Sequence, residues 1–299
     1  MGVLGSVLEL WRYPVKSMQG EGLTEAQVSQ RGVLGDRAFA LIDRRDGRVA
    51  SAKQPRKWAA LLSCHAAFVE PPSPGRPLPP VEIILPDGSV TRSDALDIDA
   101  VLSGFIGRDV TLATVAPTTP TLEEWWPAIE GLAPAEHIDA GRIQTEHEGE
   151  VVTDEAMGMV SPPGTFFDCG PLHLITDVTL AELGRHHSTG HVDRRRFRPN
   201  VLVGSAGRGF VENKWLGHTL QIGAGVTLSI ALPTPRCVMT TLAQPDIGAD
   251  RSILQVVAAT NRVTVEGLGT WSCTGVYATV VDCGTMAVGD QIIRTDKDE

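Results

Sequence analysis

Residues 275–294 read GVYATVVDCGTMAVGDQIIR, and this stretch decides the class of fold. Its two apolar runs, GVYATVV and QIIR, flank a turn region that contains Gly284 and Gly289. Apolar runs rich in β-branched residues and separated by glycines are typical of paired strands. Upstream, HTLQIG (218–223) and VTLSIAL (226–232) flank a glycine turn in the same way. The C-terminal half is therefore predicted to be a barrel or a strongly bent sheet.

The N-terminal half shows the same kind of pattern. VLELWRY (7–13) stops at Pro14, RAFALID (37–43) is followed by the turn RRDG, and VEIIL (81–85) is followed by the turn PDG. Apolar runs that end at turn residues predict strands and hairpins. A barrel or bent sheet is expected in this half too.

Helices form a minority of the predicted structure. Helical spacing of apolar residues or an N-cap signal marks three segments, which are 97–108, 176–187 and 252–260. The predicted class is thus mainly β with a few helices (α+β). Strand signals stop in APTTPTLEEWWPAIEGLAPAE (116–136), where prolines space out polar and aromatic residues. We place a domain division there, with a barrel-like domain over residues 1–120 and a second barrel domain over residues 121–299.

Composition excludes some classes of function. The chain has 299 residues, with 42% hydrophobic and 21% charged, and no apolar stretch reaches the roughly 20 residues that a membrane span needs. Its formal net charge of −10 opposes approach to a polyanion, so no nucleic-acid partner is expected. The N-terminus lacks the basic region of a secretion signal, and the five cysteines form no CxxC pair. A cytoplasmic location is therefore predicted.

Hydrogen-bond donors gather where apolar strands end. They are Lys16 and Ser17 in YPVKS, Arg37 in LGDRAFA, and Arg194, Arg195, Arg196, Arg198 and Asn200 in HVDRRRFRPN. If these donors converge, they form a site for a phosphate or carboxylate, to which the helix start near Thr176 would add free N–H groups. The alternative for the arginine run is a solvated, exposed face.

One thiol stands apart from the others. Cys237 follows Arg236 and two prolines in PTPRCVMTT (233–241). A lone cysteine is often only a small buried hydrophobe, but a neighbouring guanidinium is expected to lower the pKa of this thiol and favour the reactive thiolate. The other cysteines have no adjacent base and are interpreted as structural. The histidines show no spacing that supports a zinc site or a hydrolase.

The motifs in combination resemble a known family. LWRYPVKSMQGE (10–21) and GLTEAQVSQRGVLGDRAFALID (22–43) resemble the N-terminal β-barrel that precedes MOSC domains. FRPNVLV, FVENKWLG, PRCVMTT and GVYATVVDCGTMAVGD resemble the MOSC domain itself. The two-part arrangement is similar to the mitochondrial amidoxime-reducing components and their bacterial relatives. The resemblance covers nearly the whole chain and is weakest across residues 70–95 and 118–165.

The resemblance implies a molybdenum cofactor, whose pterin carries a phosphate and holds the metal through a dithiolene. Cys237 matches the family's cysteine ligand to the metal and is its implied catalytic residue, with Arg236 available to balance charge. The implied cofactor contacts are Lys16, Ser17, Arg37, Arg198 and Asn200, together with Thr176 and Asp177 at the helix start. The domain class is also associated with pyridoxal phosphate binding.

The implied activity is reduction of the N–O bond in N-hydroxylated small molecules. No ferredoxin-like cysteine cluster follows VGDQIIRTDKDE, so a separate electron-transfer protein of the ferredoxin, flavoprotein or cytochrome type is expected as donor. The family often has an acidic residue before a proline after CVMTT, where this chain has LAQPDIG, so Asp246 has no assigned role. Two alternatives stay open. One is a cofactor carrier or sulfur-transfer protein that uses Cys237, and the other is a structural binding protein without metal.

Overall fold

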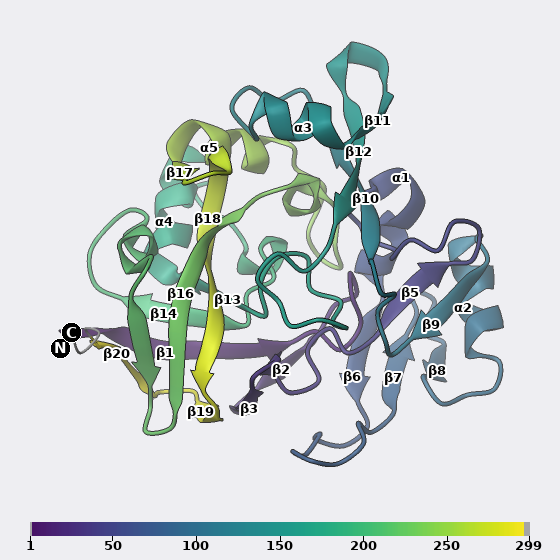
Figure 1. Ribbon diagram of the computed structural model, residues 1–299, viewed down its shortest axis with the longest axis horizontal. Coiled ribbons are helices and arrows are strands. Elements are labelled where there is room, and N and C mark those ends of the chain that lie inside the picture. The colour runs from purple at the N-terminus through teal and green to yellow at the C-terminus, as the bar shows by residue number, and fades with distance from the viewer. Residues whose placement is uncertain (1, 296–299) are drawn as a thin grey trace.

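A closed barrel of seven strands, parallel at one pairing and antiparallel elsewhere, occupies the left side of the view in Figure 1. The computed structural model describes residues 2–295. Strand β13 pairs with β14 in parallel and with β18 in antiparallel orientation, which closes the barrel. In order around the barrel the strands are β13 (Leu172–Thr176), β14 (Val201–Ser205), β1 (Gly2–Arg12), β20 (Gln291–Thr295), β15 (Thr219–Ile222), β16 (Val226–Pro235) and β18 (Gly269–Asp282). The predicted class, mainly β with a few helices, is confirmed.

Alternation of apolar side chains explains why these strands close into a barrel. Every second residue of a strand faces the same side, so one apolar face per strand is enough to fill the interior. Val7 of β1, Leu220 of β15 and Leu228 of β16 are at most 1% exposed and belong to one core. Leu10 of β1 joins the same core because the register of β1 against β14 shifts between Val7 and Glu9. The hairpin of β15 and β16 is one that the sequence pattern predicts.

Strand β1 joins the first residues of the chain to the C-terminal strands. It pairs with β14 from Gly5↔Ser205 to Leu10↔Val201 and with β20 on its other edge. A Cβ on Gly5 would lie 2.0 Å from the backbone oxygen of Gly204, so glycine is needed at this close approach. The division near residue 120 stays a prediction, and β1 forms its barrel hydrogen bonds with strands from beyond that point.

A second core lies under small sheets in the N-terminal half. β5 (Ala40–Asp43) pairs with β9 (Val110–Ala113), and β7 (Val81–Ile84) pairs with β6 (His65–Phe68) and β8 (Val90–Arg92). Helix α1 (Pro55–Trp58) and helix α2 (Ile98–Ile106) bury Trp58 and Leu102 in this core. α2 is the helix that the spacing at 97–108 predicts.

Three further helices and several short strands complete the fold. α4 (Asp177–His186) and α5 (Ser252–Thr260) match the predicted helical segments, whereas α3 (Ala135–Gly141) has no predicted counterpart. The remaining strands are β2 (Glu21–Leu23), β3 (Glu25–Ser29), β4 (Gly32–Val33), β10 (Thr121–Trp126), β11 (Arg142–Thr145), β12 (Val151–Ala156), β17 (Arg262–Val265) and β19 (Gly284–Ala287). None of the helices in the described part of the chain is long and apolar enough to cross a membrane.

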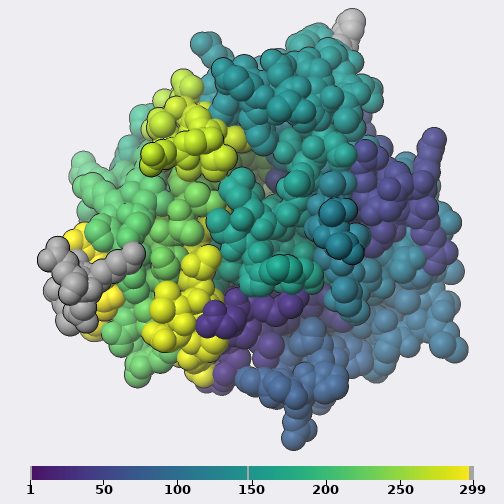
Figure 2. Space-filling model, viewed as in Figure 1, coloured from purple at the N-terminus to yellow at the C-terminus, as the bar shows by residue number. Residues whose placement is uncertain are grey.

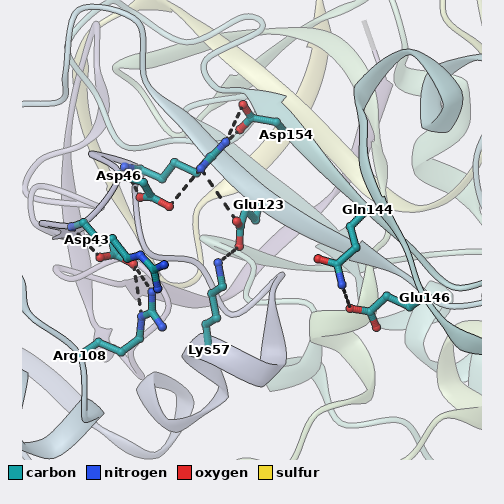
Figure 3. A network of polar contacts seen from close by, with 10 residues as sticks. Asp43, Asp46, Lys57, Arg108, Glu123, Gln144, Glu146 and Asp154 are labelled. Carbon is teal, nitrogen blue, oxygen red and sulfur yellow. Dashed lines mark hydrogen bonds and ion pairs between the residues drawn. The ribbon is translucent and has the colours of Figure 1, made fainter.

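The sheet of β10, β12 and β11 stands at the top of Figure 1 beside α3. Ion pairs attach it to the N-terminal half, as Figure 3 shows. Arg48 pairs with Asp154 of β12 at 3.0 Å and also contacts Asp46, while Lys57 of α1 pairs with Glu123 of β10 at 2.5 Å. These contacts bring β10 next to the N-terminal loops.

Candidate functional site

One large cavity lies where the barrel, the N-terminal loops and the sheet of β10 and β12 meet. In Figure 2 the green and yellow barrel residues and the purple and blue N-terminal residues lie on either side of a teal segment. The cavity has a volume of about 180 Å³ and opens to solvent. Seven of the predicted site residues line it, which are Lys16, Ser17, Arg37, Arg198, Asn200, Arg236 and Cys237.

Three of these residues have an unusual backbone conformation. Ser17, Arg37 and Arg198 have φ angles of 65°, 46° and 53°, in the left-handed region that non-glycine residues seldom adopt. Such strain persists only where the surrounding structure enforces it, and it is concentrated at functional sites. The loops after β1, after β4 and before β14 thus each turn one cavity residue through a left-handed bend.

Arg198 is the least satisfied of the donors. Its residue is 8% exposed, and neither Nη1 nor Nη2 has a hydrogen-bond partner. Burial, together with the charge of Arg37, lowers the pKa of this guanidinium to about 10. A buried, unpaired cation is costly, so this arrangement favours a bound anion.

Arg37 and Asn200 are held in place by a buried carboxylate. Asp36 forms an ion pair with Arg37 and accepts a hydrogen bond of 2.9 Å from Asn200 Nδ2. Asn200 Nδ2 also donates to Trp11 O, and its Oδ1 accepts from His173 N at 3.1 Å. Asn200 therefore connects β1 to β13. Arg37 Nη2 donates a hydrogen bond to the carbonyl oxygen of Arg198 at 3.3 Å.

A chain of alternating charges crosses the cavity. Lys16 Nζ donates to Phe166 O at 2.9 Å and pairs with Asp168. Asp168 Oδ2 lies 3.5 Å from Lys53 Nζ, which donates to Glu124 Oε2 at 2.8 Å. Burial opposes the charge on Lys53, but Glu124 and Asp168 raise its pKa well above the usual value. Lys53, Glu124 and Asp168 were not predicted as site residues from the sequence. Of the three, only Glu124 lies in the proline-spaced segment 116–136, where the strand signals stop.

Cys237 lines the cavity just after β16, before a short 3-10 helix (Val238–Thr241). The ladder between β16 and β18 is irregular between Pro233 and Pro235, as expected where prolines remove donors. Burial raises the pKa of the Cys237 thiol to about 12, Glu124 raises it too, and Lys53 lowers it. Cys169 also lines the cavity, and burial raises the pKa of its thiol to about 11.

The expected effect of Arg236 on this thiol is wrong. Its side chain turns to the barrel wall, where Nε donates to Thr274 O at 2.9 Å and Nη1 donates to Phe197 O at 3.3 Å. Burial therefore outweighs the neighbouring guanidinium, and the free thiol is protonated at neutral pH. A metal ligand at this position has to lose its proton on binding.

Thr176 and Asp177 lie outside the cavity lining. Thr176 caps α4 by accepting from Thr179 N, and its hydroxyl donates to the buried Glu212. Asp177 Oδ1 accepts from Val178 N at 2.8 Å and from Ser205 N at 3.0 Å. The helix-start N–H groups expected to bind an anion are thus bonded to side chains of the helix start itself.

The arginine run divides between two environments. Arg194 and Arg195 pair with Glu9 and Asp193 beside a separate hollow, and their side chains are half-buried rather than fully solvated. Arg196 is 7% exposed, and its Nη2 donates to Gly248 O at 2.7 Å, which holds the loop after Cys237. The exposed-face interpretation is therefore wrong for Arg196 and Arg198. Asp246 is exposed and does not line the cavity.

Aromatic side chains form another part of the cavity wall. The Trp126 and Trp271 ring centroids lie 6.2 Å apart, and His137 lies edge-on to Trp271 at 4.7 Å. His137 Nε2 is 3.2 Å from Glu155 Oε2. All four residues line the cavity, and Trp126 and Glu155 come from the sheet of β10 and β12.

Comparison with known proteins agrees with this architecture. Residues 4–65 match the model of the MOSC N-terminal beta barrel domain, and residues 162–293 match that of the MOSC domain. The chain is 26% identical to mitochondrial amidoxime reducing component 2 of Rattus norvegicus, over 97% of this chain and 83% of that protein. For mitochondrial amidoxime-reducing component 1 of Homo sapiens the identity is 25%, over 82% and 68%. The YuaD protein from Bacillus subtilis aligns with a TM-score of 0.44 at 10% identity, over 96% of this chain and 93% of that one.

Proposed function

Because this chain is a MOSC-domain protein with an N-terminal MOSC β-barrel domain, we propose that it binds a molybdenum cofactor and reduces N-hydroxylated small molecules. Its electrons would come from a separate donor protein. Two amidoxime-reducing components, to which it is similar along most of its length, carry this type of activity in their names. The proposal extends that chemistry to the cavity described above.

The observation that carries the proposal is the unpartnered guanidinium of Arg198 in the same cavity as Cys237. A pterin cofactor with a phosphate brings the anion that buried Nη1 and Nη2 lack, and its metal takes a thiolate ligand. Charge-assisted hydrogen bonds from arginine to phosphate are among the stronger ones in proteins. The donor set and the Cys237 thiol therefore fit this group.

The other residues have separate tasks in this scheme. Lys16, Ser17 and Arg37 would bind the cofactor from the N-terminal loops, and Cys237 would bind the metal after losing its proton. Lys53 lies close enough to favour the thiolate electrostatically. When bound, the metal supplies the two-electron chemistry, in which an N-hydroxylated amine, two electrons and two protons give the amine and water.

The aromatic part of the cavity wall suits the body of the substrate. Trp126 and Trp271 are 4% and 7% exposed, so this part is largely shielded from water. Flat apolar surfaces bind flat apolar ligands, while a few polar groups orient them. We assign to His137 and Glu155, which pair here, the orientation of polar substrate groups.

The first test measures molybdenum and pterin in protein purified from a cofactor-competent host. Cys237→Ala is expected to lose most of its molybdenum, because the metal loses its protein ligand. Arg198→Ala is expected to lower the affinity for the cofactor about tenfold, because a charge-assisted hydrogen bond from arginine to the phosphate is lost. Arg195→Ala is the matched control, since this arginine of the same run pairs with Asp193 outside the cavity.

Turnover then separates the proposed activity from the alternative. A reductase consumes an N-hydroxylated compound in the presence of a chemical reductant, whereas a cofactor carrier or sulfur-transfer protein binds the cofactor without net reduction. Wild-type protein that contains neither molybdenum nor pterin when cofactor is abundant would contradict both.

A further inference from the structure

Tyr13 lies directly after β1 and contacts both arginines of the anion site. The Cζ atom of Arg37 lies 4.5 Å from the centroid of the Tyr13 ring, and that of Arg198 lies 4.3 Å from it. Tyr13 is only 3% exposed, so both stacks are shielded from water. Cation–π contacts are stronger in such desolvated places than on the surface.

Two main-chain hydrogen bonds and one from the side chain hold Tyr13 in place. Tyr13 N donates to Asp36 Oδ1 at 2.7 Å, and Tyr13 O accepts from Arg37 N at 2.8 Å. The hydroxyl donates to Pro199 O at 3.2 Å, in the loop that carries Arg198. One side chain therefore connects two loops that are 161 residues apart in the sequence.

The guanidinium groups of Arg37 and Arg198 both lie beside the buried ring of Tyr13, and Asp36 is the carboxylate that pairs with Arg37 there. Asp36, whose side chain is fully buried, forms an ion pair with Arg37, while neither Nη1 nor Nη2 of Arg198 has a hydrogen-bond partner. Electrostatic repulsion between the two guanidinium groups pushes them apart, which opposes the binding of one anion by both. The π-face of an aromatic ring attracts each of them without donating a hydrogen bond or using up their N–H groups.

We propose that Tyr13 is a positioning residue that holds Arg37 and Arg198 together and leaves Arg198 free to bind an oxyanion. The proposal rests on the anion-binding part of the proposed function and needs neither molybdenum nor turnover. Tyr13 itself does not line the cavity and does not touch the anion. It acts through the two arginines.

The test is a double-mutant cycle on the full chain without cofactor. The binding of inorganic phosphate is measured by calorimetry at low ionic strength for wild type, Tyr13→Leu, Arg198→Ala and the double variant. Tyr13→Leu is expected to weaken phosphate binding about tenfold in the wild-type background, because two desolvated stacks are lost. In the Arg198→Ala background the same change is expected to have a clearly smaller effect.

A purely structural role gives a different result. It would lower phosphate affinity by the same factor in both backgrounds, which would overturn the proposal. Wild-type protein that binds no phosphate would overturn it as well. If the protein binds phosphate but never binds molybdenum, the proposed function fails while this inference stands.

Two controls define the contribution of the ring. Tyr13→Phe keeps the ring and loses only the bond to Pro199, so its affinity is expected to stay within about threefold of wild type. Trp11→Leu removes a similar stack, with Arg194 at 4.0 Å, outside the cavity and is expected to leave phosphate binding unchanged. If Tyr13→Leu does not fold, Arg198→Lys replaces it, because lysine keeps the charge but not the planar stack. Wild-type affinity in Arg198→Lys would then contradict the proposal.

Discussion

At the scale of single residues, His173 shows how the buried cations affect their neighbours. It is 3% exposed on β13, and its Nε2 accepts a hydrogen bond from Arg236 Nη2. Burial lowers the pKa of His173 well below its usual value, and the charges of Arg236 and Arg37 lower it further. The native protein therefore holds a neutral imidazole here.

This environment predicts a pH dependence of stability. An unfolded histidine binds a proton below about pH 6.5, whereas folded His173 does not, so the unfolded state binds more protons and stability falls as the pH drops. The contribution reaches at most about 1.4 kcal/mol per pH unit below that point. Urea unfolding between about pH 5 and pH 7.5 measures it, as this is the range in which an ordinary histidine titrates.

His173→Gln is expected to flatten this pH profile, because glutamine does not titrate and keeps an acceptor for Arg236. His191→Gln, at an exposed position, is the control and is expected to follow wild type. Equal slopes for wild type and His173→Gln would show that the imidazole does not remain neutral in the native state.

At the scale of elements, β10 forms two lysine–glutamate ion pairs, one with Lys53 just before α1 and one with Lys57 of α1 itself. Lys53 pairs with Glu124 inside the cavity, and Lys57 pairs with Glu123 outside it. Consecutive strand residues point to opposite faces, and this is why neighbouring glutamates reach different environments. The side chains of Lys53 and Glu124 are 14% and 5% exposed, against 29% and 10% for Lys57 and Glu123.

The two pairs are expected to differ in their effect on stability. Lys53→Met leaves Glu124 buried without its partner and is expected to destabilise the protein by about 3–5 kcal/mol. Lys57→Met is expected to cost about 0–1 kcal/mol, since its pair is nearer to solvent. Urea denaturation at neutral pH compares them, and Lys53→Met/Glu124→Gln should recover part of the loss. Similar losses for both lysines would contradict the difference in burial.

At the scale of the whole molecule, β1 connects the two halves of the chain. It lies between β14 and β20, so the barrel is closed only when the first residues are present. The N-terminal loops that follow β1 carry Lys16, Ser17 and Arg37 into the cavity. The barrel and the anion site therefore depend on the same strand.

A chain of residues 121–299 is expected not to form the native barrel. Without β1, the facing edges of β14 and β20 lose their partners, and exposed strand edges favour aggregation. Circular dichroism and size-exclusion chromatography of this fragment measure the effect. A monomeric fragment with a native-like cooperative unfolding transition would show that β1 is dispensable and would support the predicted division near residue 120.

The sequence by itself determined the strand-rich class and the places where donors follow strands. Alternation, turn residues and prolines are local patterns, and they predict the β15–β16 hairpin and α2. Short motifs also placed Lys16, Arg37 and Arg198 among the candidates. Their roles in binding a cofactor stay predictions.

Only the tertiary structure decided which charges meet and which groups are buried. Lys53 and Glu124 come from separate segments but line the same cavity, and Tyr13 stacks on Arg198 from outside the lining. No local sequence pattern shows either arrangement. Arg236 is adjacent to Cys237 in sequence, yet burial controls the pKa of the thiol. The reason is physical, because the charge and hydrogen bonding of a side chain depend on neighbours in space and on access to water, which the order of residues does not specify.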